Sequence, residues 1–267
     1  MRTVLTARAT DRGRVRLENQ DSAGVFPEVR GDTPLPKGQL FIVADGMGGH
    51  NAGREASELA VETLGNEYFA SISRDVETSL RQGFAAANTR IYQKSASGPG
   101  FAGMGTTCTA LVLTNGQALI GHIGDSRIYR ITRTKITQLT EDHSRVAELV
   151  RRAIITKEQA RTHPERSQLY RAMGTRPEVD VDIIGPLKLP QTCHFLMCTD
   201  GLFNHVTEDE MQSIVLARPP AEACASLIAL ANERGGHDNI TLQIITATST
   251  GKGPRKMLPA KHRRTEA

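Results

Sequence analysis

The segment from Leu40 to His50 constrains the fold more than any other part of this chain. Its first five residues, LFIVA, are all apolar and include branched and aromatic side chains, which is typical of a buried β-strand. The strand leads into Asp45 and the GMGG string, where missing Cβ atoms allow a sharp turn or the close approach of a ligand. Apolar residues at helical spacing follow from about 53 to 69. The pattern predicts an acid held on a rigid edge between a strand and a helix.

Two familiar glycine-rich motifs do not fit this segment. A phosphate-binding P-loop requires Lys and a hydroxyl residue after its last glycine, whereas Gly53 is followed by Arg54 and Glu55. A dinucleotide-binding fingerprint requires a third glycine where Asn51 stands. An ordinary glycine-rich turn remains the alternative to a functional loop, and other acids in the chain must decide between them.

Length and composition predict a single globular domain. The chain has 267 residues, of which 39% are hydrophobic and 23% charged. It contains no run of 18 apolar residues and no basic-then-apolar amino terminus, so we expect neither a membrane span nor a secretory signal, and a cytoplasmic location. The four cysteines are scattered among apolar neighbours, which favours reduced core residues over disulfides or a zinc site: Cys108, Cys193, Cys198 and Cys224.

The net charge of +4 arises from the carboxyl-terminal end of the chain. Residues 251–267 contain six Lys or Arg and one Glu, so the remainder is nearly neutral. We therefore predict a domain over residues 1–248 and a basic, disordered tail over 249–267. With no Trp and only four Tyr, the chain lacks the stacking residues of a nucleic-acid-binding surface, and we expect no specific nucleic-acid partner.

Strands and helices are predicted along the whole domain from hydrophobic periodicity and capping residues. Strands are expected at 4–9, 107–113, 117–123, 127–132, 194–199 and 240–245, and helices at 53–69, after Ser73 or Asp75, within 141–178, after Thr207 and after Pro219. The connections at 114–116 and 124–126 are short, which predicts an antiparallel meander through residues 107–132.

Three aspartates occupy the same kind of position, each at the tip of a predicted strand beside Gly or Asn: Asp45, Asp200 and Asp238. Buried carboxylates raise one another's pKa, so a group of them implies a counter-ion. Ligand sets made only of oxygen favour Mg²⁺ or Mn²⁺ over zinc. Asp125 lies in a Gly-Asp-Ser string that, taken alone, is more typical of a plain turn.

Seven short strings, in order, resemble those of the metal-dependent type 2C Ser/Thr protein phosphatases, the PPM family, and most of all its compact bacterial members. They are Arg16-x-x-Asn19-Gln20-Asp21, Asp45-Gly46-Met47-Gly48-Gly49-His50, Gly103-Met104-Gly105-Thr106-Thr107, Gly124-Asp125-Ser126-Arg127, Asp142-His143-Ser144, Thr199-Asp200-Gly201-Leu202 and Asp238-Asn239-Ile240-Thr241. The resemblance spans residues 3–247. It implies an α+β fold in which two antiparallel sheets form a sandwich flanked by helices in an αββα arrangement, with a flap at about 145–175.

The resemblance also implies a mechanism and a set of site residues. Hydrolysis of phosphoSer or phosphoThr would proceed by direct attack of water bridging two Mn²⁺ or Mg²⁺ ions, with a third ion as in bacterial relatives. The implied metal ligands are Asp45 as the bridge, the Gly46 carbonyl, Asp200, Asp238 and, for the third ion, Asp125. Arg16 would bind the substrate phosphate, and His50 would protonate the departing oxygen. Asp21, Gln20 and Asn239 would lie in the outer shell.

One departure from the family pattern opens an alternative function. Gln20 stands where the family usually has Glu, so a metal-bound water would lose a charged acceptor. The alternative is a phosphatase-like binding module with weakened metal chemistry. If the protein is a phosphatase, we expect a monomer that acts on phosphorylated proteins and opposes a cytoplasmic Ser/Thr kinase.

Overall fold

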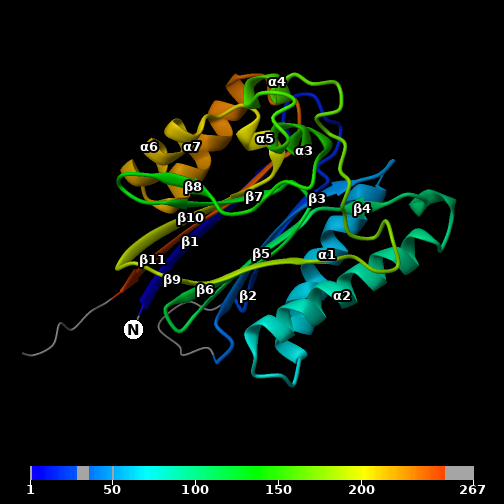
Figure 1. Cartoon of the computed structure of the whole chain (residues 1–267), viewed down its shortest axis with the longest axis horizontal. Coiled ribbons are helices and arrows are strands. Elements are labelled where there is room, and N and C mark those ends of the chain that lie inside the picture. The colour runs from blue at the N-terminus through cyan, green and yellow to red at the C-terminus, as the bar shows by residue number, and fades with distance from the viewer. Residues whose placement is uncertain (1, 29–35, 50, 250–267) are drawn as a thin grey trace, which may run out of the picture.

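Two antiparallel β-sheets form the centre of the protein (Figure 1). The computed structural model describes residues 2–28, 36–49 and 51–249. One sheet has the order β1 (Arg2–Asp11), β11 (Ile240–Ser249), β10 (Thr192–Cys198), β7 (Arg127–Ile131), β8 (Ile136–Gln138). The other has the order β2 (Asp21–Phe26), β3 (Gln39–Met47), β5 (Cys108–Thr114), β6 (Gln117–Ile123), β9 (Asp182–Lys188), and β4 (Gly105–Thr106) pairs with β3.

Helices cover the outer face of each sheet (Figure 1). The long helices α1 (Ala52–Ala70) and α2 (Val76–Ser95) pack on the sheet that contains β3, and α6 (Glu208–Ala217) and α7 (Pro220–Glu233) pack on the sheet that contains β11. Four shorter helices are η1 (Pro99–Phe101), α3 (Arg145–Arg151), α4 (Lys157–Arg161) and α5 (Asp200–Phe203). This arrangement confirms the expected αββα sandwich.

Strand β3 is buried on both of its faces, which explains its unbroken apolar sequence. Leu40, Ile42 and Ala44 pack toward α1 and α2, whereas Phe41 and Val43 pack between the sheets. All five side chains are completely buried. A strand with two buried faces loses the alternation of apolar and polar residues and reads as a continuous hydrophobic run.

The predicted meander through residues 107–132 is only half right. β5 and β6 do form a hairpin, with Thr114 paired to Gln117. β7, however, belongs to the opposite sheet, where it pairs with β10. The chain changes sheets at Gly124, whose φ of +106° is accessible to glycine and rarely to other residues. This crossing carries Asp125 to the end of the sandwich.

Four strands carried no usable sequence signal: β2, β4, β8 and β9. β9 contains Gly185 and Pro186, which disfavour a central strand, and it lies at a sheet edge where proline is tolerated. The others are short or polar. β3 also runs two residues beyond Asp45, so this acid lies within the strand and not at its end.

Helix boundaries agree with the capping signals. Asp75 accepts a hydrogen bond from the Thr78 backbone N–H at 2.8 Å and caps α2. Capping boxes are present at the starts of α4 and α6, on Thr156 and Thr207. All four cysteines are free and buried, as predicted.

Two sequence expectations fall on parts of the chain that the structure does not describe. His50 is one of them, and the basic tail is the other, apart from Ser249 at the end of β11. No helix among the described residues is sufficiently long and apolar to cross a membrane.

Candidate active site

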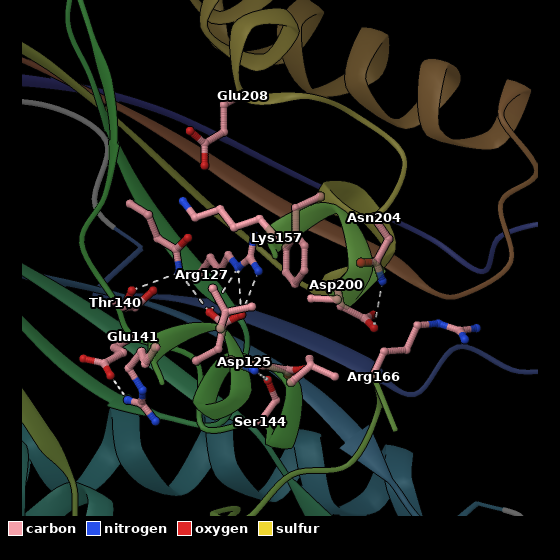
Figure 2. Close-up of a pocket in the computed structure, with 18 residues that line it drawn as sticks. Asp125, Arg127, Thr140, Glu141, Ser144, Lys157, Arg166, Asp200, Asn204 and Glu208 are labelled. Carbon is pink, nitrogen blue, oxygen red and sulfur yellow. Dashed lines mark hydrogen bonds and ion pairs between the residues drawn. The ribbon is translucent and has the colours of Figure 1, made fainter. Parts of the chain in front are cut away.

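Five aspartates from both sheets meet at one end of the sandwich. Asp21 on β2 is paired directly across from Asp45 on β3. Asp125 follows β6, Asp200 begins α5 directly after β10, and Asp238 precedes β11. Figure 2 shows the Asp125 and Asp200 side chains facing the same space. Asp45 lies within the electrostatic influence of the other four carboxylates.

Burial and mutual repulsion raise the pKa values of four of these carboxyl groups, those of Asp21, Asp45, Asp125 and Asp200. Burial, followed by the charge of Asp21, raises the pKa of Asp45 well above its ordinary value. The pKa of Asp125 is likewise raised well above its ordinary value, first by burial and then by Asp200. Burial is also the largest cause of the shifts at Asp21 and Asp200. The pKa of Asp21 is raised to about 7 and that of Asp200 to about 6. The cluster therefore favours a cation that would offset its negative charge.

Two carboxylate oxygens in this cluster suit a cation that has oxygen ligands. Oδ1 of Asp21 and Oδ1 of Asp200 are buried and accept no hydrogen bond from any described residue. Because every acid of the cluster is an aspartate, the donor set fits Mg²⁺ or Mn²⁺. Among the described residues, however, no group of three or more His, Cys, Asp or Glu side chains is already arranged so that it could hold a metal ion. The residues therefore supply suitable donors that would have to adjust to hold an ion.

Arg16 lies beside this cluster. Its Nη2 donates a hydrogen bond to Asp238 Oδ2 at 2.6 Å, and about half of the side chain is exposed. The bond to Asp238, with smaller contributions from Asp45 and Asp200, raises the pKa of the guanidinium. A guanidinium carries five N–H donors, so Arg16 can bind Asp238 and an anion at the same time.

Asn239 fixes the loop on which Arg16 lies. Its Nδ2 donates to the backbone oxygens of Arg12 at 2.9 Å and Glu18 at 2.8 Å. Its Oδ1 accepts a hydrogen bond from the Gln20 backbone N–H at 2.8 Å. One amide thus holds both ends of the loop, a role that the sequence motif did not reveal.

Gln20 lies against the start of helix α1. A Cβ at Gly53 would lie 2.5 Å from Gln20 Oε1 and 2.9 Å from the Gly46 carbonyl oxygen. Glycine at position 53 is therefore required for the amide and this carbonyl to approach the helix. The predicted outer-shell residue and the predicted carbonyl ligand are neighbours in the structure.

Thr199 and an ion pair between Arg127 and Asp142 support the cluster. Sequence reasoning assigned none of these residues a role. Thr199 Oγ1 donates to Asp21 Oδ2 at 2.8 Å. Arg127 binds Asp142 through Nε and Nη2, and its guanidinium lies 3.6 Å from the centre of the Phe203 ring. Arg127 and Asp142 both belong to the strings that resemble the family, so the sequence could have suggested a role for each. Their pairing with each other appears only in the fold.

A pocket of about 310 Å³ opens beside Asp125 and Asp200, and part of its lining comes from the segment that was expected to form a flap (Figure 2). That segment contains α3 and α4 and is attached at its far end where Met173 forms a β-bridge with Thr106. The pocket is lined by Asp125, Arg127, Gln138, Thr140, Glu141, Asp142, Ser144, Val146, Ala147, Val150, Arg151, Lys157, Ala160, Arg166, Asp200, Phe203, Asn204 and Glu208.

Comparisons with known proteins agree with this geometry. The family described as Protein phosphatase 2C matches residues 14–233. Serine/threonine phosphatase stp of Listeria monocytogenes is 40% identical over 250 residues, which cover 91% of this chain and 96% of the relative. The solved PPM Ser-Thr phosphatase MsPP from Mycobacterium smegmatis, in complex with cacodylate, has a TM-score of 0.77 at 35% identity and covers 90% of this chain and 97% of its own.

A second solved structure contains metal. It is the catalytic domain of the serine threonine protein phosphatase PstP in complex with 2 manganese ions, with a TM-score of 0.79 at 30% identity, covering 93% of this chain and all of its own. The two-sheet sandwich with acids at one end is thus the architecture of a PPM-type phosphatase. The chain belongs to the protein phosphatase 2C family and is a Ser/Thr protein phosphatase of the bacterial type.

Proposed function

We propose that the aspartate cluster holds two Mn²⁺ or Mg²⁺ ions and that the protein hydrolyses phosphoSer and phosphoThr monoesters by direct attack of water. The observation that carries the proposal is the gathering of five aspartates at one end of the sandwich, two of whose oxygens are buried and unpartnered among the described residues. The manganese ions of PstP supply the analogy for the metal. Such ions, when bound, supply Lewis-acid stabilisation of the phosphoryl group and activate water.

Each residue of the site would have a distinct role. Asp45, Asp200, Asp238 and the Gly46 carbonyl would hold the two ions, and Asp125 would hold a third. Arg16 would orient the substrate phosphate through the guanidinium N–H groups that do not face Asp238. His50, which lies outside the described residues, would protonate the departing Ser or Thr oxygen. Asp21, Gln20 and Asn239 would lie in the outer shell and hold the metal ligands in place.

The biological setting belongs to the proposal too. The substrates would be phosphoproteins made by a Ser/Thr kinase of the same cytoplasm, and the enzyme would act as a monomer. Its catalytic unit would be residues 1–248 and its basic extension 249–267.

Hydrolysis of an aryl phosphate and of a phosphoThr peptide, with Mn²⁺ or with a chelator, tests the proposal. Both activities should be lost with the chelator and restored by Mn²⁺. Turnover that needs no metal would contradict it, and so would a protein that binds phosphopeptide but hydrolyses nothing at any metal concentration. The second result would favour the phosphatase-like binding module.

Gln20→Glu should lower the Mn²⁺ concentration needed for half-maximal activity by about tenfold, because outer-shell changes typically alter metal affinity by about 10–100-fold. An added carboxylate beside the Gly46 carbonyl strengthens the negative field at the metals, and the amino terminus of α1 stabilises it. The saturated rate should change less. A metal titration of both proteins on one aryl phosphate measures the effect, and an unchanged or higher requirement would show that position 20 does not influence the metals.

A further inference from the structure

His143 connects the turn that carries Asp125 to the rest of the site, although no role in the mechanism above requires it. Only 2% of its surface is exposed. Its backbone N–H donates to the Gly124 carbonyl at 2.8 Å, and its ring Nδ1 accepts from the Gly124 backbone N–H at 3.0 Å. Both polar backbone groups of the residue that precedes Asp125 are therefore bound to His143.

These contacts determine the protonation of the ring. A backbone N–H can only donate, so Nδ1 of His143 must carry a lone pair. The neutral ring then has its proton on Nε2, which lies 2.9 Å from Asp182 Oδ2 and donates to it. Arg171 Nη1 lies 3.2 Å from the same Nε2, but its two protons can go to Asp182 Oδ1 at 2.5 Å and to the Asp180 backbone oxygen at 3.4 Å. Asp182 thus fixes the tautomer that can accept from Gly124.

The same histidine is attached to the end of the flap. Its backbone oxygen accepts from the Tyr170 N–H at 2.9 Å, and Arg171, the next residue, holds the second oxygen of Asp182. On its other side, Ser144 caps α3, the first helix of the flap. Figure 2 shows Ser144 directly below Asp125. A single buried side chain therefore lies between the flap, strand β9 and the Asp125 turn.

We propose that His143 is a positioning residue that fixes the Gly124–Asp125 turn for metal binding, and that Asp182 holds its ring in the required orientation. The inference rests on the proposed function for the role of Asp125. It adds that the geometry of this ligand depends on the hydrogen bonds of His143 and, through Asp182, on the attachment of the flap.

Two substitutions of the histidine separate its bonds. In His143→Asn the side-chain oxygen can still accept from Gly124 but the side chain no longer reaches Asp182. In His143→Gln the amide can reach Asp182 but the acceptor for Gly124 is lost. In the metal-free protein, hydrogen exchange at the Gly124 amide should become about tenfold faster or more in His143→Gln and should change less in His143→Asn.

Metal binding should follow the same order. Calorimetric titration of Mn²⁺ should show the weakest binding step about tenfold weaker in His143→Gln, with a smaller loss in His143→Asn. Asp182→Asn should also weaken this binding step, because Arg171 at the end of the flap loses its charged partner. Asp180→Asn, two residues away and exposed, and His194→Asn, whose ring bonds Thr246 on β11, are the matched controls and should bind Mn²⁺ as the wild type does.

Unfolding curves confirm that each variant is folded before it is compared. Equal Gly124 exchange in wild type and His143→Gln would overturn the proposal, and so would faster exchange with unchanged Mn²⁺ affinity. Failure of the proposed function itself would look different, since the wild type would then show no metal-dependent hydrolysis while the exchange experiment would still report on the contact.

Discussion

Asp45→Asn is expected to reduce phosphatase activity by roughly three orders of magnitude or more while making the metal-free protein more stable. Activity falls because the proposed bridging ligand is lost. Stability rises because Asp45 is paired across from Asp21 and is repelled by the charges of four other aspartates. A neutral amide of the same shape removes that repulsion. We expect a rise in melting temperature of about 2–6 °C in the presence of chelator.

Asp238→Asn should cost as much activity but stabilise the metal-free protein less. Asp238 is paired with Arg16 at 2.6 Å, so its substitution removes an attraction together with the repulsion. Asp75→Asn is the control, because an asparagine caps a helix about as well as an aspartate and Asp75 lies at the start of α2. Melting curves with chelator and rates with Mn²⁺ measure both effects. Near-normal turnover of Asp45→Asn at moderate Mn²⁺ would mean that the cluster is not the metal centre.

The acids of the site could be found from the sequence because they are local features of strands and turns. Asp45, Asp200 and Asp238 each follow or precede an apolar run beside Gly or Asn, and the fold brings all three together. Asp125 was ambiguous because Gly-Asp-Ser also describes a plain turn. Its place at the end of the sandwich depends on the crossing between sheets at Gly124, which a hairpin-length connection does not reveal.

Side-chain contacts between distant segments could not be predicted. Thr199 bonds Asp21 across 178 residues of sequence, and Asn239 binds the loop that begins at Arg12. Nothing in the local pattern of either residue distinguishes it from an ordinary turn or strand residue. Strand β2, which places Asp21 opposite Asp45, was missed because its sequence, DSAGVF, contains a glycine and only two large apolar residues. Pairing with β3 supplies the stability that its own sequence lacks.

Between pH 6.5 and 8 the free energy of unfolding of the metal-free protein is expected to fall as the pH rises, by about 1 kcal/mol or more. The pKa of Asp21 is raised to about 7 in the folded protein, from an ordinary value of 3.8. Those of Asp45 and Asp125 are also raised. In this range the folded state therefore binds more protons than the unfolded state, so stability is lost as these groups ionise.

The pH range is chosen to limit the contributions of other titratable groups. Burial lowers the pKa of His122 to about 3 and also lowers the pKa values of His143, His194 and His205. These histidines take up protons more readily in the unfolded state, most fully below pH 6.5, and therefore give a slope of opposite sign. Above about pH 8 the buried thiols of Cys108 and Cys198, whose pKa values are raised by burial, begin to contribute. Between these limits no more than half of each unfolded histidine is protonated, so the carboxyl groups of the cluster should dominate.

Saturating Mg²⁺ should reverse the sign of this dependence. A bound cation requires ionised carboxylates, so binding releases protons and becomes stronger as the pH rises. Urea unfolding at pH 6.5 and 8, with chelator and with Mg²⁺, measures the four free energies that are needed. Asp21→Asn should flatten the slope seen with chelator, because it removes one of the groups that titrate in this range. A metal-free protein that is equally stable at both pH values would show that these carboxyl groups are already ionised at pH 6.5, and that the cluster does not need a cation to offset its charge.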